Sequence, residues 1–162
     1  MFPYFGRKDR IKKLYPAPKN EKIIEPFAGS APYSLLYWEH DITIADKYEI
    51  IIEIWKYLQS ASKKDILKLP KIKHWNIICC DYFQIQNEKA TWFIDPPYQK
   101  EGGAYIHNKI NYEYLAKWCK NRKGQVIVCE NIEADWLPFK PLNKKFQITQ
   151  TKKQFKEGIW TN

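Results

Sequence analysis

Short apolar runs bounded by turn residues alternate with amphipathic segments along this chain. The apolar runs indicate buried β-strands, and the spacing of Ile51, Ile52, Trp55 and Leu58 indicates a helix. Strands are predicted at residues 22–25, 41–45, 75–80, 91–94 and 125–129. Helices are predicted at residues 11–14, 33–39, 48–60, 112–121 and 134–137, with a final antiparallel strand pair at 145–151 and 158–161. This alternation predicts a three-layer α/β fold with an antiparallel edge.

The strand predicted at residues 91–94 runs into Asp95-Pro96-Pro97-Tyr98. The two prolines must end the strand, because proline lacks the N–H that a sheet requires. A carboxylate, a carbonyl and an aromatic ring are therefore expected at the carboxyl edge of the sheet, where open α/β sheets bind ligands. Such groups suit a planar ring that bears an amine. The alternative is an ordinary strand exit with a surface Asp.

Three upstream strands also end in turn or polar residues. Residues 22–25 lead into a turn of small residues around Gly29, and Pro32 suits the start of the helix that follows. Asp46 follows the second strand, where an acid either accepts ribose hydroxyls or caps the next helix. The third strand ends at Asp81, with two aromatic residues after it.

Size and charge indicate one nucleic-acid-binding domain. The chain has 162 residues, which predicts a single domain over residues 1–162. Its net charge is +9 and 16% of its residues are aromatic, so binding to a phosphate backbone with bases stacked on rings is expected. A general lysine-rich bias is the competing explanation for the charge.

The sequence contains no apolar stretch long enough to span a bilayer, and residues 1–8 lack an apolar signal core. A cytoplasmic protein without membrane contact is therefore the expectation. The four cysteines form no C-x-x-C pair and the three histidines are scattered, so no metal site is predicted. Cys79 and Cys80 lie in an apolar strand pattern and are expected to be reduced core residues.

Taken in chain order, these residues resemble the Dam-type adenine-specific DNA methyltransferases, which use S-adenosyl-L-methionine. Residues 3–8 are similar to the family's amino-terminal cofactor motif, 25–31 to its glycine motif and 95–98 to its catalytic tetrapeptide. Residues 158–162 are similar to its closing strand. The resemblance implies a Rossmann-like methyltransferase fold with a seven-stranded mixed sheet and one antiparallel strand.

The resemblance also implies roles for the matched residues. The implied cofactor-binding residues are Tyr4, Lys8, Glu25, Phe27, Gly29, Asp46, Asp81, Tyr82 and Phe83. Lys8 would pair with the methionine carboxylate, Asp46 would hold the ribose hydroxyls, and Asp81 would accept a hydrogen bond from the cofactor's adenine amine. Asp95, the Pro96 carbonyl and Tyr98 would hold the target base.

The implied reaction transfers a methyl group to the exocyclic amine of adenine. That amine is a poor nucleophile, because its lone pair is delocalised into the ring. Acceptors on both of its N–H bonds, from Asp95 and Pro96, would favour a pyramidal nitrogen that can attack the methyl group in line. The expected partner is DNA, either single-stranded or a duplex from which the adenine is flipped and stacked on Tyr98.

The chain departs from the family in two places. Ala31 stands where the family usually has glycine, and residues 47–80 leave no room for the separate target-recognition domain that is common there. Site recognition would then come from residues 99–108 and the basic tail, with Gln154 or Phe155 over the base, or from a partner subunit. The alternatives are methylation of RNA adenine and a non-catalytic subunit of a larger assembly. Restriction–modification, anti-restriction and regulation are all compatible with the sequence as biological roles.

Overall fold

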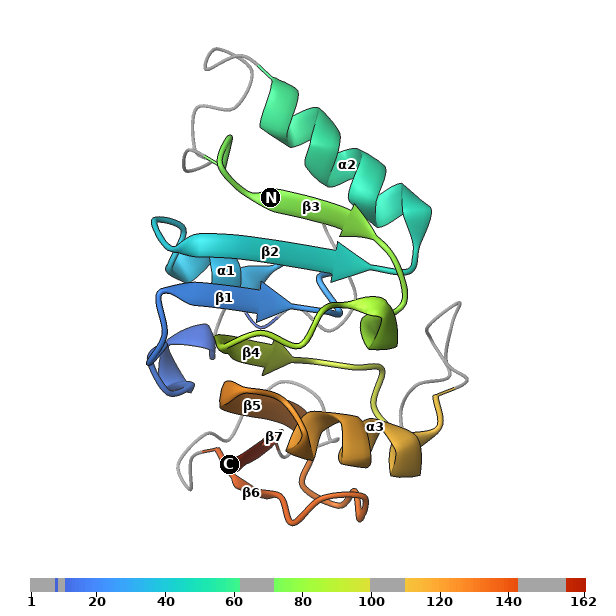
Figure 1. Cartoon of the computed structure of the whole chain (residues 1–162). Helices are drawn as coiled ribbons and strands as arrows, with labels where there is room; N and C mark the ends of the chain where they lie inside the picture. The colour runs from blue at the N-terminus through green and yellow to red at the C-terminus, as the bar shows by residue number, and fades with distance from the viewer. Residues whose placement is uncertain (1–7, 9–10, 62–71, 100–109, 143–156) are drawn as a thin grey trace, which may run out of the picture.

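Seven strands form one sheet in the order β3-β2-β1-β4-β5-β7-β6 (Figure 1). The computed structural model describes residue 8 and residues 11–61, 72–99, 110–142 and 157–162. The strands are β1 (Lys22–Glu25), β2 (Asp41–Asp46), β3 (Asn76–Cys79), β4 (Ala90–Ile94), β5 (Gly124–Asn131), β6 (Lys140–Pro141) and β7 (Glu157–Thr161). Strands β1 to β5 pair in parallel, and β7 runs antiparallel to both of its neighbours. The sheet therefore has one reversed strand, as predicted.

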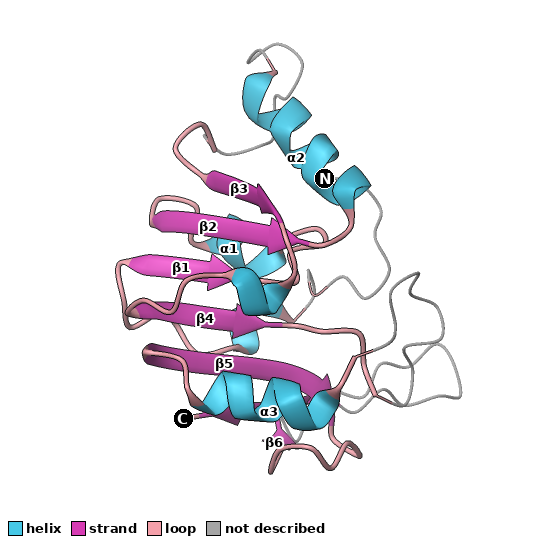
Figure 2. Cartoon of the chain, turned by 45° about the vertical axis from the view of Figure 1, so that its right-hand side comes forward, coloured by secondary structure: helices cyan, strands magenta, loops and turns pink. Residues whose placement is uncertain are grey.

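Helices cover both faces of the sheet. The α-helices are α1 (Pro32–Leu36), α2 (Glu49–Ser60) and α3 (Tyr112–Lys120), and the 3-10 helices are η1 (Lys12–Leu14) and η2 (Tyr82–Gln84). Figure 2 shows α3 in front of the sheet and α1 behind it. The α/β sandwich has three layers because a sheet with two apolar faces must bury both.

Alternation along each central strand sends its side chains into two separate cores. All five residues of β4 are buried. Phe93 belongs to the cluster with Tyr33 of α1 and Trp55 of α2, whereas Trp92 belongs to the cluster with Trp118 of α3. The apolar run at residues 91–94 is thus a strand buried on both faces, since successive side chains point to opposite sides.

The observed elements confirm most of the sequence prediction within a few residues. Pro32 occupies the first turn of its helix, as expected, but α1 ends at Leu36 and the 3-10 geometry of η1 is tighter than an α-helix. The helix predicted at residues 134–137 is wrong, because that segment is irregular with a bend at its end, and Pro138 follows it directly. Strand β7 pairs with β5 and β6, and the strand predicted at residues 145–151 lies outside the described residues.

The cysteines differ from the prediction in one respect. Cys79 is exposed and Cys80 is half-buried at the edge strand β3, so this pair is not part of the core. The buried thiols are those of Cys119 and Cys129, and all four cysteines are free. Edge position explains the difference, because β3 has no neighbouring strand on its outer side.

Within the described ranges, no helix is both long and apolar enough to cross a membrane.

Candidate active site at the carboxyl edge of the sheet

An acidic residue stands at the carboxyl end of each parallel strand. These residues are Glu25, Asp46, Asp81, Asp95 and Glu130, in the order of β1 to β5. Because parallel strands all end at one edge, the five carboxyl groups line the same side of the sheet. The reversed strand β7 begins at this edge with Glu157, which is paired with Asn131 at the end of β5.

Lys8 lies between the carboxylates of Asp95 and Glu157. Its ammonium nitrogen is 3.4 Å from Oδ1 of Asp95 and 3.4 Å from Oε1 of Glu157. It also donates a hydrogen bond of 2.5 Å to the hydroxyl of Tyr98 and lies 4.4 Å from the centre of that ring. The side chain of Lys8 is only 8% exposed, so two acids surround one poorly solvated cation. Of the residues proposed from sequence, Lys8, Asp95 and Tyr98 are therefore in direct contact.

Burial changes the acid–base properties of this cluster. Desolvation raises the pKa of Asp95 to about 6, although the Lys8 ammonium opposes the shift. Desolvation also raises the pKa of Tyr98 well above its ordinary value, and the charges of Asp95 and Glu157 add to this effect. At neutral pH Asp95 is thus mainly ionised, whereas the Tyr98 hydroxyl keeps its proton.

The turn that contains Pro96 and Pro97 is fixed from two neighbouring elements. Tyr112, the first residue of α3, donates a hydrogen bond of 2.7 Å to the carbonyl of Pro97. The carboxylate of Glu130 accepts a hydrogen bond of 3.1 Å from the backbone N–H of Gln99, and one of 2.9 Å from the indole of Trp136. Glu130 is fully buried at the end of β5, so the exit from β4 is held by well-defined partners on both sides. No described residue donates to the Pro96 carbonyl, which keeps the acceptor role proposed for it.

The glycine turn after β1 is held by the next strand and by α2. Asp46 accepts a hydrogen bond of 3.1 Å from the N–H of Gly29, and the indole of Trp55 donates one of 2.9 Å to the Gly29 carbonyl. Gly29 has φ 45° and Ala31 has φ 43°, both in the left-handed region. A left-handed backbone at Ala31 costs an alanine on the order of 1 kcal/mol, which explains why glycine suits this position in the family that the motif resembles.

Asp46 combines two backbone contacts. Its other carboxylate oxygen accepts a hydrogen bond of 2.9 Å from the N–H of Tyr48, just before α2. The alternative that Asp46 caps the next helix is wrong, because the N-cap of α2 is Tyr48 and no side chain caps it; Asp46 holds the backbone just before the cap. The ribose role stays a prediction.

Glu25 is buried beneath the glycine turn. One of its carboxylate oxygens accepts hydrogen bonds of 3.1 Å from the backbone N–H and 2.6 Å from the hydroxyl of Ser34, in α1. Desolvation raises the pKa of Glu25 to about 8, against the lowering effect of these bonds. The carboxyl group is therefore largely protonated at neutral pH, and a nearby cation would favour its ionised form.

Asp81 begins η2 and forms a capping box with Gln84. It also lies 3.3 Å from the ammonium of Lys47. The ring of Phe27, from the glycine turn, lies 5.2 Å from that of Tyr82. Phe83 is 52% exposed. The residues predicted to hold the cofactor's adenine thus lie after β3, and the Tyr82 ring packs beside Phe27, a predicted pocket residue after β1.

Sequence reasoning missed four residues that hold this edge together, namely Tyr15, Tyr112, Glu130 and Glu157. Glu130 carries a signal that could have identified it, because it is another acid at the end of a predicted strand. Glu157 could be found once the last strand is recognised as reversed, since its first residue then falls at the carboxyl edge. Tyr4 lies outside the described residues.

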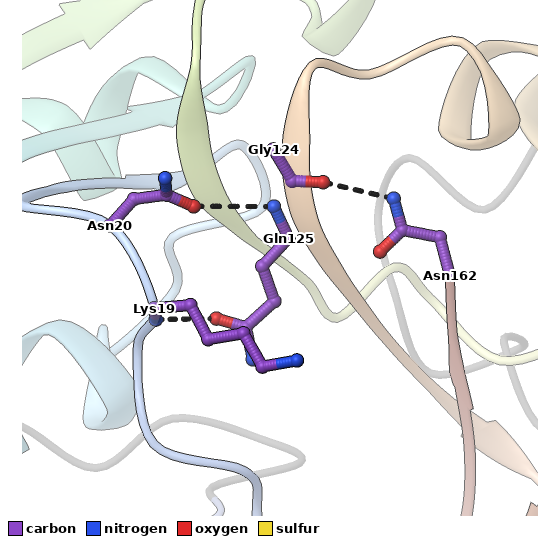
Figure 3. A pocket seen from close by; sticks show the side chains of 5 residues that line it. All are labelled: Lys19, Asn20, Gly124, Gln125 and Asn162. Carbon is purple, nitrogen blue, oxygen red and sulfur yellow. Dashed lines mark hydrogen bonds between the residues drawn. The ribbon is translucent and has the colours of Figure 1, made fainter.

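A hollow of about 340 Å³ lies at the edge of the sheet opposite to the strand-end acids (Figure 3). Its lining residues are Lys19, Asn20, Gly124, Gln125 and Asn162. These residues bond to one another: Lys19 N–H donates to the Gln125 side chain at 2.7 Å, and the Asn162 amide donates to the Gly124 carbonyl at 2.9 Å. The hollow is accordingly a hydrogen-bonded junction where β5 begins, away from the strand-end acids.

The sheet order, the reversed strand and the glycine turn after β1 define a three-layer Rossmann-like fold, the fold that S-adenosylmethionine-dependent methyltransferases have. No group of three or more His, Cys, Asp or Glu side chains in the described part of the chain is placed to hold a metal ion. The described part of the site consists of acids, Lys8, aromatic rings and backbone groups.

No protein-family model and no curated protein sequence matches this chain. Among solved structures, a candidate methylase from Haemophilus influenzae is similar over 95% of this chain and 89% of its own, with a TM-score of 0.53 and 16% identity. The mitomycin 7-O-methyltransferase MmcR is similar over 77% of this chain, with a TM-score of 0.50 and 12% identity. This chain covers 35% of the MmcR chain, so it spans about a third of that protein. At these identities the likeness establishes the fold.

Proposed function

We propose that this chain is an S-adenosylmethionine-dependent methyltransferase that modifies the exocyclic amine of a flipped adenine in DNA. The observation that carries the proposal is the Asp95-Pro96-Pro97-Tyr98 turn at the carboxyl end of β4, next to the glycine turn that follows β1. The two segments are neighbours because β1 and β4 are paired in the sheet. A base amine held by the first would lie beside a cofactor bound at the second.

The residues at this edge fit the proposed cofactor. S-adenosylmethionine carries a sulfonium and an ammonium, and it supplies an activated methyl group. Glu25, Asp95, Glu130 and Glu157 interact electrostatically at this edge, and Lys8 is the cation that the structure places among them. Among the described residues, the carboxyl groups at this edge outnumber the ammonium of Lys8, which favours a cationic ligand. Burial raises the pKa of Glu25, and a cationic ligand beside it would favour its ionised form.

The chain's own groups would act on the base by orientation and electrostatics. Asp95, ionised above a pKa of about 6, would accept one N–H of the amine, and the Pro96 carbonyl would accept the other. Two acceptors draw the nitrogen lone pair out of the ring. Tyr98 would contact the face of the base. Because Tyr112 and Glu130 fix the turn, these acceptors need little reorganisation during the reaction.

The acceptors read an amine and not the sugar, so RNA adenine is the second candidate substrate. The net charge of +9 suits either nucleic acid. We place DNA first on the resemblance of residues 95–98 and 25–31 to the adenine-specific DNA family. Of the segments expected to read a site, 99–108 and the basic tail, all of the first after Gln99 lies outside the described residues, as does the basic tail at residues 144–156. A partner subunit is the other proposed source of recognition.

The test uses purified chain with methyl-labelled S-adenosylmethionine and duplex DNA, single-stranded DNA or RNA. Digestion to nucleosides and mass spectrometry should show N6-methyladenine from DNA. Asp95→Asn keeps the shape of the side chain and is expected to lower transfer by roughly 100-fold or more, with cofactor affinity retained. Asp41→Asn is the matched control, since Asp41 is 58% exposed at the opposite end of the sheet. Cofactor binding without methylation of any of the three substrates would show that the chain is not an autonomous enzyme.

A further inference from the structure

Glu157 reaches the site because β7 runs against the other strands. The first residue of a reversed strand lies at the edge where parallel strands end, and Glu157 is accordingly paired with Asn131 at the end of β5. Its side chain is 17% exposed. Nothing in the sequence motifs of the proposed methyltransferase site includes this position.

The carboxylate of Glu157 joins two tyrosines from distant parts of the chain. Its Oε1 atom accepts hydrogen bonds of 2.6 Å from the Tyr15 hydroxyl and 2.7 Å from the Tyr98 hydroxyl. Lys8 lies 3.4 Å from the same atom. Tyr15 is itself only 3% exposed and packs edge-on against Phe93 of β4, 5.0 Å away. Oε1 of Glu157 thus links Tyr98 to Tyr15, and through Tyr15 to the core that packs against β4.

These contacts fix the far end of the Tyr98 ring. The hydroxyl accepts a hydrogen bond from Lys8 and donates one to Glu157, so its oxygen has a partner on either side. The near end of the ring is attached to a turn that Tyr112 and Glu130 already hold. A ring held at both ends keeps one orientation before the base binds. A flexible surface tyrosine would instead lose rotamer entropy on binding a base.

We propose that Glu157 is a positioning residue of the base-binding turn: through the Tyr98 hydroxyl it sets the ring orientation, and through its charge it sets the field at Asp95. The inference rests on the proposed function. In this proposal Glu157 does not contact the base.

The charge of Glu157 has a separate, measurable consequence at Asp95. Among the described residues, the titratable groups that interact with Asp95 are Lys8, Tyr15, Glu25, Tyr98, Cys129, Glu130 and Glu157. The pKa of Asp95 is raised to about 6 in all: burial raises it most, the Lys8 ammonium opposes the rise, and the charge of Glu157 contributes to it. Removing the negative charge of Glu157 therefore lowers the pKa of Asp95. If transfer requires ionised Asp95, the acidic limb of the rate profile moves to lower pH.

The experiment compares Glu157→Gln, Glu157→Ala and the control Glu113→Gln in methyl transfer to DNA from pH 5 to pH 9. Glu113 is 81% exposed on α3 and pairs with Lys117 on the same helix, so its variant changes an acid outside the site. Glu157→Gln keeps an oxygen that can accept from Tyr98, so we expect a shifted acidic limb with a modest loss of rate. Glu157→Ala should lower kcat/KM for DNA by about tenfold or more, without weakening cofactor binding measured by calorimetry.

A double-mutant cycle identifies the route of the effect. If Glu157 orients the ring through the Tyr98 hydroxyl, then at pH 9, where Asp95 is ionised in every variant, Glu157→Ala combined with Tyr98→Phe should be no slower than the slower single variant. Tyr15→Phe should have a smaller effect on transfer than Tyr98→Phe. Additive losses in the Glu157 and Tyr98 cycle, or a Glu157→Gln profile identical to that of Glu113→Gln, would overturn the inference while leaving the proposed function intact. A wild-type chain that transfers no methyl group would overturn the proposed function and, with it, the role assigned to Glu157.

Discussion

The carboxylate of Asp46 accepts the backbone N–H of Gly29 across a distance of 3.1 Å. The contact joins the end of β2 to the turn after β1, and the same carboxylate accepts the N–H of Tyr48. A single side chain therefore satisfies two backbone donors that would otherwise lack these partners.

Asp46→Ala is expected to lower the free energy of unfolding by about 1–3 kcal/mol, because it leaves these two N–H groups without their acceptor. Urea denaturation followed by tryptophan fluorescence measures the change. Asp41→Ala, at the exposed start of the same strand, should cost less than about 1 kcal/mol. Equal losses at the two positions would contradict the role of Asp46 in holding the glycine turn.

Gly124→Ala should be strongly destabilising. Gly124 has φ +99°, and a Cβ atom at this position would meet the carbonyl oxygen of Ala90 at 2.2 Å. Strain and overpacking each cost about 1–3 kcal/mol, so we expect a loss of roughly 2–6 kcal/mol in urea denaturation. Gly158→Ala is the comparison, because its nearest atom would be 3.0 Å away and its backbone is not left-handed. A smaller loss of unfolding free energy for Gly124→Ala than for Gly158→Ala would contradict this prediction.

The stability of the chain should fall as pH rises from about 4.5 to about 8, owing to Glu25. The ordinary pKa of this carboxyl is 4.5 and burial raises it to about 8 in the folded chain. Between these values the folded state binds more protons than the unfolded state, so increasing pH favours unfolding. Glu25→Gln keeps an acceptor for Ser34 and removes this dependence, which should make the variant more stable than the wild type at pH 9 by on the order of a few kcal/mol.

Thermal denaturation at pH 5 and pH 9 provides the measurement for Glu25. Glu113→Gln, with its side chain exposed on α3, should retain the wild-type slope between the two pH values. A Glu25→Gln variant that loses as much stability as the wild type over this range would show that Glu25 is ionised in the folded chain.

Tyr112→Phe tests whether the turn after β4 must be held. It removes the hydroxyl that donates to the Pro97 carbonyl at 2.7 Å and should lower the free energy of unfolding by about 0.5–1.5 kcal/mol. Under the proposed function, kcat should fall more than cofactor affinity, because the acceptors for the base amine become less well fixed. Tyr114→Phe on the same helix is the matched control, since this ring is 51% exposed. Transfer kinetics that do not distinguish the two variants would mean that Tyr112 does not position the turn.

Local sequence patterns predicted the parallel part of the sheet well. The double proline after Ile94 and the acids after the first three strands are short-range signals, and each marks the end of an observed strand. The helix predicted at residues 134–137 was wrong because its apolar residues serve the core without helical geometry: Ala134 and Leu137 are buried, and Trp136 donates to Glu130. Tertiary contacts overrode a weak local preference there.

The sequence predicted those site residues that directly follow a strand in the chain, and it did not predict those brought to the site from elsewhere. Asp95 and Tyr98 belong to one motif, whereas the contact between Tyr98 and Glu157 depends on the direction of β7. The hydrophobic periodicity of a segment does not indicate which distant hydroxyl groups will donate to the same carboxylate oxygen. The same holds for Tyr15, whose partner lies 142 positions away in sequence.

The contact between Lys8 and Glu157 spans 149 positions of the chain. Closing so long a loop is entropically costly, and it can occur only after β7 has docked against β5. A ribosome-bound chain that has already formed β1 to β5 would therefore still lack the acid that orients Tyr98. In refolding experiments, secondary structure should recover before the cluster around Tyr98, and the time at which methyl transfer returns would report the docking of the reversed strand.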